Sequence, residues 1–183
     1  MKQLTTLFAL LMAACLSACS TTSTISSGTS LEAGAKWALL PLTNHTDTPQ
    51  AALAAEVIAE HQLRLRGVSN IAHYPATLSR DSLFEPTERR VLDEAQKWAR
   101  EQGMRYGLQG DVEEWRYKVG IDGEPAVGLT LQVIDLSTGA IVWSASGAQS
   151  GWSREALSAV ARKVVERLMN DMPTLQPAHG GNP

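Results

Sequence analysis

The sequence has few of the residues from which proteins build disulfides, metal sites and catalytic groups. Of its 183 residues only two are cysteines, and both lie within the first 19 positions. The four histidines are scattered, without the paired spacing of a metal-binding helix. The chain has no glycine-rich phosphate loop ending in Lys-Ser or Lys-Thr, and Ser150 stands one position late for a nucleophile elbow. The sequence therefore predicts a protein without cofactor or metal that is not an enzyme.

Basic runs are also missing, and the overall charge is mildly acidic. The chain carries 16 Lys and Arg against 19 Asp and Glu, a formal net charge of −3. A chain of this charge without a basic stretch is a poor partner for nucleic acid, so we expect none. If Lys2 is removed with an N-terminal signal, the mature chain carries −4. This charge is ordinary for one chain but becomes large when an oligomer repeats it.

The N-terminus has the pattern of a lipoprotein signal. Lys2 precedes an apolar stretch, 4–16, that is too short to span a bilayer as a permanent helix and is typical of a secretory signal. Leu16-Ser17-Ala18-Cys19 resembles the bacterial lipobox, in which the cysteine becomes the acylated first residue. An ordinary signal peptide cleaved before a chance cysteine is the alternative. We expect residues 1–18 to be the signal and Cys19 to carry lipid. Because Ser20 is not an inner-membrane retention aspartate, we expect the protein at the periplasmic face of the outer membrane.

Composition divides the remainder into a tether, one domain and a tail. Residues 19–35 are rich in serine, threonine and glycine and almost uncharged, and a flexible tether of this length reaches on the order of 20–25 Å. Residues 36–172 hold enough apolar side chains for a single core. Residues 173–183 are rich in proline and glycine and are predicted to be disordered.

Three consecutive strands give the strongest secondary-structure signal. Apolar residues fall on even positions up to Val112 and on odd positions from Trp115, which predicts a half-buried strand with a β-bulge where the phase changes. Two turn sequences follow, each with a glycine suited to a positive φ. The strands and turns are, in order, 106–119, Asp122-Gly123, 129–133, Ser137-Thr138-Gly139 and 141–145. This pattern predicts an antiparallel meander.

Two short strands and three amphipathic helices complete the pattern: strands 37–42 and 68–74, and helices 49–66, 87–102 and 153–172. Thr48 is expected to cap the first helix, with Pro49 at its first position. We expect one apolar stripe of that helix to face the core, and its members are Leu53, Val57, Ile58, His61 and Leu65. His61, on or beside this stripe, would then be a packed core or rim histidine rather than a ligand. The order β-α-β-α-β-β-β-α predicts an α+β fold, a mixed α/β sandwich in which helices cover the meander.

Two features stand out as candidate functional residues. Trp152 lies between Gly151 and Ser153 at a strand–helix junction. An indole suits the headgroup level of a membrane, but packing against the sheet edge fits the sequence equally well. Asp111 and Glu113 share a strand face, yet no histidine or third carboxylate is tied to them by sequence. An acidic face toward solvent or a neighbouring subunit is therefore favoured over a catalytic or metal-binding pair.

Four segments resemble the PelC family, outer-membrane lipoproteins of the Pel exopolysaccharide export system: 110–128, 143–155, 37–49 and 74–90. The resemblance implies a non-enzymatic ring of identical subunits on the periplasmic side of the outer membrane. Such a ring funnels a cationic, partly N-acetylated amino-sugar polysaccharide to an outer-membrane export porin during secretion of the biofilm matrix.

The same resemblance implies roles for individual residues. Trp152 would contact the membrane beside the lipid on Cys19. Asp122 and Glu124, in the hairpin turn, would guide the polymer, although solvated turn residues are the equally simple alternative. Arg105 and Arg116 would pair across the interface between subunits.

Two other functions fit parts of the pattern. A lipoprotein activator of a peptidoglycan synthase would carry a longer tether than 20–35, because it has to cross the periplasm. A secretion pore like CsgG would need lipid-facing hairpins of about 9–11 residues per strand. The charged residues Glu114, Arg116 and Lys118 on one strand face fit a soluble sheet better.

Overall fold

The computed structural model describes residues 21–25, 30–75, 88–120 and 123–177. Six strands form one sheet in the order β1-β6-β5-β4-β2-β3. They are β1 (Thr21–Ile25), β2 (Trp37–Asn44), β3 (Ile71–His73), β4 (Tyr106–Tyr117), β5 (Pro125–Asp135) and β6 (Ala140–Ser150). The helices in the described residues are α2 (Ala51–Leu65), α3 (Glu88–Glu101) and α4 (Leu157–Asn170). This is the α+β fold that the sequence predicts, and the prediction is confirmed.

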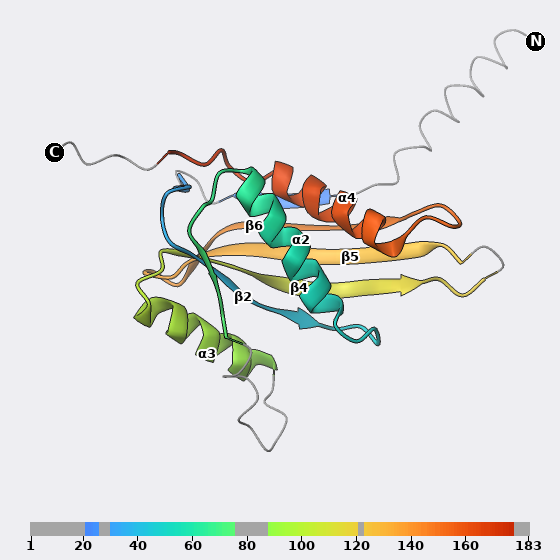
Figure 1. Ribbon diagram of the computed structural model, residues 1–183, viewed down its shortest axis with the longest axis horizontal. Coiled ribbons are helices and arrows are strands. Elements are labelled where there is room, and N and C mark those ends of the chain that lie inside the picture. Colours follow the sequence, from blue (N-terminus) through green and yellow to red (C-terminus); the bar gives the residue numbers. More distant parts are fainter. Residues whose placement is uncertain (1–20, 26–29, 76–87, 121–122, 178–183) are drawn as a thin grey trace, which may run out of the picture.

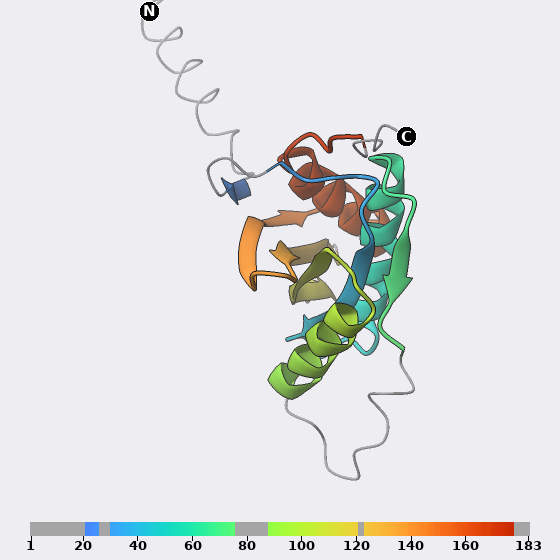
Figure 2. The same cartoon turned by 90° about the vertical axis from the view of Figure 1, so that its left-hand side faces the viewer.

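The sheet separates two unequal helical layers. Helices α2 and α4 lie side by side over one face, and α3 lies on the opposite side near β2 (Figures 1 and 2). Strands β4, β5 and β6 form the predicted antiparallel meander. Strand β2 runs parallel to both β4 and β3, since helical crossovers connect them. The second face of the meander is therefore left largely without a helix.

The main core lies between the sheet and the α2–α4 layer. Trp37 and Trp143 are fully buried there, and the rings of Trp37 and Tyr106 lie 4.8 Å apart between centroids. Burying one large apolar side chain contributes about 1.5–3 kcal/mol, so these residues dominate the packing. A smaller cluster under α3 contains Ala38, Leu40, Ala95, Ala99, Ile134 and Leu136.

The bulge and both turns of the meander are where the sequence places them. The register of β4 against β5 shifts between Val112 and Glu114, which accounts for the change of apolar phase. Gly123 and Gly139 have φ values of 51° and 75°, a backbone region that side chains with a Cβ rarely adopt. Asp122 lies outside the described residues.

The start of α2 differs from the prediction. The helix begins at Ala51, and Gln50, with φ of 62°, precedes it without a side-chain cap. The Thr48 hydroxyl instead donates to the carbonyl oxygen of Trp115. Thr48 thus joins the loop after β2 to β4, and its predicted capping role is wrong because a tertiary partner takes the hydroxyl.

The buried face of α2 also differs from the prediction. Its buried residues are Ala51, Ala52, Ala55, Ala59, Gln62 and Leu63. Of the predicted packed stripe, only Ile58 packs against the core. Leu53, Val57 and Leu65 are exposed, as is His61, so the prediction is wrong for these four residues. Small alanine side chains let the helix approach the sheet closely, and the larger apolar residues consequently point away from it.

Ordered structure extends past both expected ends of the domain. Strand β1, within the expected tether, pairs antiparallel with β6. Leu31 is fully buried, and Gln176 donates its backbone N–H to the Leu31 carbonyl oxygen at 2.8 Å. These contacts join the segments before β2 and after α4 along one side of the fold.

Candidate functional site

A polar row begins under α3 and continues along the same sheet face beyond the helix. Gln96 of α3 donates to Gln109 of β4 at 2.8 Å, and Gln109 donates to Gln132 of β5 at 3.3 Å. Further along the strands, the hydroxyl of Thr130 lies 3.0 Å from that of Ser146 on β6. The alternation of side chains along a strand places these polar residues opposite the apolar core.

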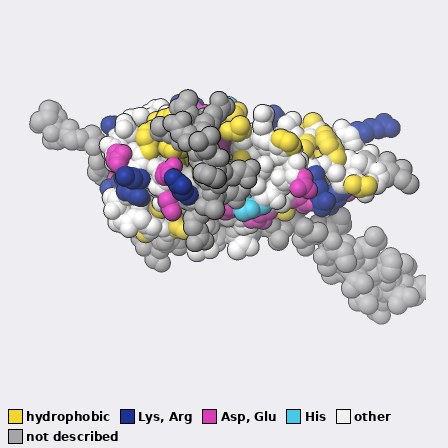
Figure 3. Space-filling model, turned by 90° about the horizontal axis from the view of Figure 1, so that it is seen from below, with side chains coloured by type: hydrophobic (Ala, Val, Ile, Leu, Met, Phe, Trp, Pro, Cys, Tyr) yellow, Lys and Arg dark blue, Asp and Glu magenta, His cyan; other side chains and the backbone are white. Residues whose placement is uncertain are grey.

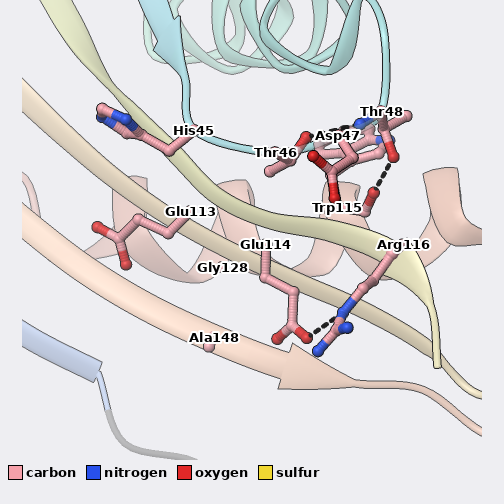
Figure 4. Close-up of a pocket in the computed structure, with 10 residues that line it drawn as sticks. All are labelled: His45, Thr46, Asp47, Thr48, Glu113, Glu114, Trp115, Arg116, Gly128 and Ala148. Carbon is pink, nitrogen blue, oxygen red and sulfur yellow. Dashed lines mark hydrogen bonds and ion pairs between the residues drawn. The ribbon is translucent and has the colours of Figure 1, made fainter.

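A hollow opens on this face at the bulge of β4 (Figure 4). It has a volume of about 470 Å³, and we call it the acidic hollow. The loop after β2, the bulged part of β4 and two small residues of β5 and β6 surround it. Its lining is His45, Thr46, Asp47, Thr48, Glu113, Glu114, Trp115, Arg116, Gly128 and Ala148. A Cβ on Gly128 would lie 3.4 Å from the Glu114 Cβ and 3.6 Å from the Ala148 Cβ, so small residues keep the hollow open.

The bulge brings two consecutive glutamates to the same face. Figure 4 shows the carboxylates of Glu113 and Glu114 on one side of β4, with Arg116 turned back toward Glu114. Thr130 donates its hydroxyl to Glu113 at 2.6 Å, and Arg116 Nε lies 3.0 Å from Glu114 Oε1. In a regular strand these neighbours would point to opposite faces. The bulge is therefore what concentrates the charge.

Asp111 stands next to this group, with its carboxylate 3.0 Å from Nε2 of His45. The shared face predicted for Asp111 and Glu113 is confirmed, since Thr130 of β5 pairs with Asp111 in register and bonds Glu113 through its side chain. Sequence reasoning missed the loop residues His45 to Thr48 and the small residues Gly128 and Ala148. Their place beside the glutamates depends on strand order, which no local pattern reveals.

Chemically, the acidic hollow suits weak and reversible attraction of a cation. Three carboxylates and one guanidinium line it, and the ion pairs at its rim are largely solvated, each partner being partly exposed. Interactions of this kind are modest and screened by salt. In the described residues no three His, Cys, Asp or Glu side chains come together as ligands for a metal ion. On the face seen in Figure 3, acidic and basic side chains lie next to each other in small groups.

Trp152 projects from the junction of β6 and α4 and is 86% exposed. Its backbone N–H donates to Glu155 at 3.1 Å, and Glu155 in turn pairs with Lys163 at 2.6 Å. The packed alternative for Trp152 is therefore wrong in this chain. The loop backbone is fixed while the indole faces outward.

The β4–β5 hairpin end lies beside this junction. Lys118 donates to the Ser150 hydroxyl at 2.6 Å, and Gly151 donates its backbone N–H to the Pro125 carbonyl oxygen at 2.8 Å. Val119, at 102% exposure, and Arg154 are exposed at the same end. Figure 1 shows both connections at one end of the sheet.

The register of β1 places its first residue at the side of β6 nearer that end. Thr21 pairs with Gly147, and β1 runs antiparallel to β6, with Ile25 opposite Trp143. Cys19 itself lies outside the described residues. It is two residues before Thr21, and two residues span at most about 7 Å.

Of the other predicted site residues, Arg116 lines the acidic hollow, whereas Arg105 and Glu124 do not. Glu124 is exposed in the hairpin, while its partner Asp122 lies outside the described residues. Arg105 pairs with Asp135 of its own chain, with Nη2 3.1 Å from Oδ2. Arg116 pairs with Glu114. Both arginines thus have intramolecular partners, and pairing between subunits stays a prediction.

Two similar solved structures cover most of the chain. A singly substituted PelC dodecamer from Paraburkholderia phytofirmans is 40% identical with a TM-score of 0.72, covering 86% of this chain and 99% of that chain. The PelC dodecamer from the same organism is 42% identical with a TM-score of 0.67, covering 82% and 95%. Lipoprotein GNA1162 from Neisseria meningitidis, at 18% identity and a TM-score of 0.52 over 74% and 96%, is similar in fold alone. No family model and no curated protein matches the chain. No helix within the described ranges is long and apolar enough to cross a membrane.

Proposed function

Because the chain belongs to the PelC family, we propose that it assembles as a ring anchored by lipid to the periplasmic face of the outer membrane. The ring guides a cationic amino-sugar polysaccharide to an outer-membrane export porin and performs no catalysis. The observation that carries this proposal is the 40–42% identity to PelC dodecamers over most of the chain. Family membership favours this role over the synthase activator and the secretion pore.

The charge of the chain supports attraction of a polycation. Each mature chain carries −4 once Lys2 is removed, and a ring repeats this charge around one axis. Such a field raises the local concentration of a cationic polymer and weakens with ionic strength. Diffuse attraction suits transport, since a polymer held in a tight pocket would stop moving.

The acidic hollow offers a weak local binding site for the cationic polymer. Glu113 is exposed and Glu114 half-buried in the lining of this hollow. Because water still reaches both carboxylates, a protonated amino group of the polymer can move from one to the other. Asp122 and Glu124 in the hairpin are the second set of acidic residues to which we assign this guiding role.

Membrane attachment is the third part of the proposal. Acyl chains on Cys19 and the exposed indole of Trp152 would reach the same bilayer, because Thr21, two residues after Cys19, pairs with Gly147 near the β6–α4 junction. The acyl chains on Cys19 would anchor the chain to the membrane without orienting the domain. A second contact from an indole, which prefers the headgroup level, would fix the orientation of the domain.

Negative-stain microscopy and native mass of the lipidated protein in mild detergent test the ring. Particles of one size with a central opening are expected, and a monomer at all concentrations would overturn the ring. Polymer guidance is tested in cells carrying the export system, where Asp122→Lys with Glu124→Lys should lower secreted polymer without loss of rings. Asp93→Lys with Glu101→Lys, on the exposed side of α3, is the matched control. Equal secretion by both pairs would contradict the assignment of the hairpin residues.

A further inference from the structure

Helix α2 presents a row of large aliphatic side chains to solvent. Leu53, Val57 and Leu65 are 56%, 66% and 67% exposed. With His61, which is also exposed, they occupy every fourth position and form one ridge, the α2 ridge. At a rise of about 1.5 Å per residue the ridge is about 18 Å long.

The exposure of this row conflicts with the amphipathic pattern of the helix. Both faces of α2 are apolar, but the inner face carries mainly alanines that fit against the sheet. The outer face carries the larger side chains, whose burial would contribute more free energy. A contiguous apolar row on a soluble domain commonly marks an interaction surface.

A second hollow adjoins the α2 ridge. It has a volume of about 470 Å³ and is lined by Val57 and Ile58 of the helix, by His61, and by Arg162 of α4. Ridges spaced by four residues pack into the grooves of another helix in the commonest class of helix contacts. The α2 ridge can thus insert into a groove of a partner, and the adjoining hollow can accept a side chain of that partner.

Polar residues border the α2 ridge on one side. Arg64 pairs with Glu60 at 2.6 Å, and Glu60 also bonds His73 at 2.8 Å. An apolar centre with a polar rim is the usual composition of a protein–protein interface. The ridge carries no tryptophan or tyrosine, unlike the Trp152 end, so a protein partner fits it better than a lipid surface.

We propose that the α2 ridge is one half of the contact between neighbouring copies of this chain. The inference rests on the proposed ring, and it names the surface that builds it. A closed ring of more than two subunits uses a heterologous contact, so the ridge meets a different surface of the next copy. One side of every subunit then contributes the α2 ridge to this contact.

Val57→Glu tests the assignment by placing a charge in the middle of the ridge. Because Val57 is exposed in the single chain, the thermal midpoint of the unassembled protein should be unchanged. The subunit concentration for half-assembly, from native mass and light scattering, should rise at least about tenfold, as for loss of a central interface residue. Val119→Glu introduces the same charge at an exposed valine outside the ridge and should leave this concentration unchanged.

A photo-crosslinking amino acid at position 57 of the lipidated protein identifies the occupant. Covalent dimers and higher multiples are expected, with none from position 119. The α2 assignment would be overturned if position 57 crosslinked only to lipid, or if Val57→Glu assembled at the same concentration as the wild type. Neither result would contradict the proposed ring itself. A wild-type chain that is monomeric throughout would overturn the ring itself and the inference with it.

Discussion

The carboxylate of Glu56 on α2 accepts a hydrogen bond from the backbone N–H of Leu42 on β2, at 2.9 Å. The pairing of β2 with β4 is irregular between Leu39 and Leu42, and Pro41 within this segment has no N–H to donate. A helix side chain thus binds the strand at its irregular point. This contact fixes the rotation of α2, and the next residue, Val57, consequently points away from the sheet.

Replacing Glu56 with alanine should lower the free energy of unfolding by about 1–3 kcal/mol, because the Leu42 N–H loses its acceptor in a partly buried place. Glu56→Gln keeps an oxygen acceptor and should be less destabilising. Denaturant unfolding at neutral pH measures both. Equal stability of Glu56→Ala and the wild type would show that the contact contributes nothing.

The pH dependence of unfolding provides a second measurement on Glu56. Burial raises the pKa of its carboxyl above the ordinary value of 4.5, although the Leu42 N–H and His73 act in the opposite direction. A raised folded pKa means that the folded state holds this proton to higher pH. The contribution to stability is therefore most favourable below pH 4.5 and falls as pH rises through the folded pKa. The stability of the wild type relative to Glu56→Gln should therefore fall as pH rises through the folded pKa of Glu56.

Asp135 should show the opposite dependence. Burial by itself raises the pKa of this carboxyl, but hydrogen bonds from Ser137 and the charge of Arg105 outweigh it, and the pKa is lowered below 3.8. Stability from Asp135 is present above that value and is lost as pH falls through the folded pKa. Asp135→Asn should cost about 1.5–3 kcal/mol at neutral pH, and the cost should shrink in acid. Arg105→Gln, at a half-exposed partner, should cost less than about 1 kcal/mol.

Trp152→Ala should separate folding from membrane binding. The side chain is 86% exposed, so the free energy of unfolding should change by less than about 0.5 kcal/mol. Association of the lipidated protein with liposomes should weaken about tenfold, since one large apolar side chain no longer enters the bilayer. Trp152→Phe keeps a large ring and should lie between the two. Sedimentation with liposomes measures this, and unchanged binding would remove Trp152 from the membrane contact.

Binding of a cationic amino-sugar oligomer should depend on the acidic hollow and on salt. Glu113→Gln should weaken binding at low ionic strength and have little effect at 1 M salt, where charges are screened beyond about 3 Å. Ala148→Trp, at an exposed position on the lining, should weaken binding by filling the space. Asp93→Asn on α3 is the charge control. Calorimetric titration measures the affinity of each variant for the oligomer. Equal affinities for Glu113→Gln and Asp93→Asn would exclude the acidic hollow as a binding site for it.

Gly110→Ala should impair folding at the centre of the sheet. A Cβ at this position would lie 2.1 Å from the Thr130 carbonyl oxygen on β5, and a backbone atom within a strand pair cannot move aside cheaply. We expect a loss of more than about 3 kcal/mol, above the usual range for overpacked sites. Gly120→Ala, where no atom lies within 4 Å, is the control, and thermal unfolding measures both.

The sequence by itself determined the elements whose signals are local. The meander, its bulge after Val112 and its glycine turns follow from the two-residue alternation and from the need for positive φ at Gly123 and Gly139. Strand β1 was missed because Thr21 to Ile25 carries no apolar alternation; its pairing comes from the open edge of β6.

Only the tertiary structure decided which face of α2 is buried and what surrounds the glutamates. Two apolar rows run along α2, and periodicity cannot choose between them; the sheet accepts the alanine row because small side chains permit close packing. The acidic hollow joins the His45–Thr48 loop to Gly128 and Ala148, residues distant in sequence that meet because β2 and β5 flank β4, and β6 lies next to β5. Long-range strand order depends on the packing of the whole chain, and a local pattern does not contain it.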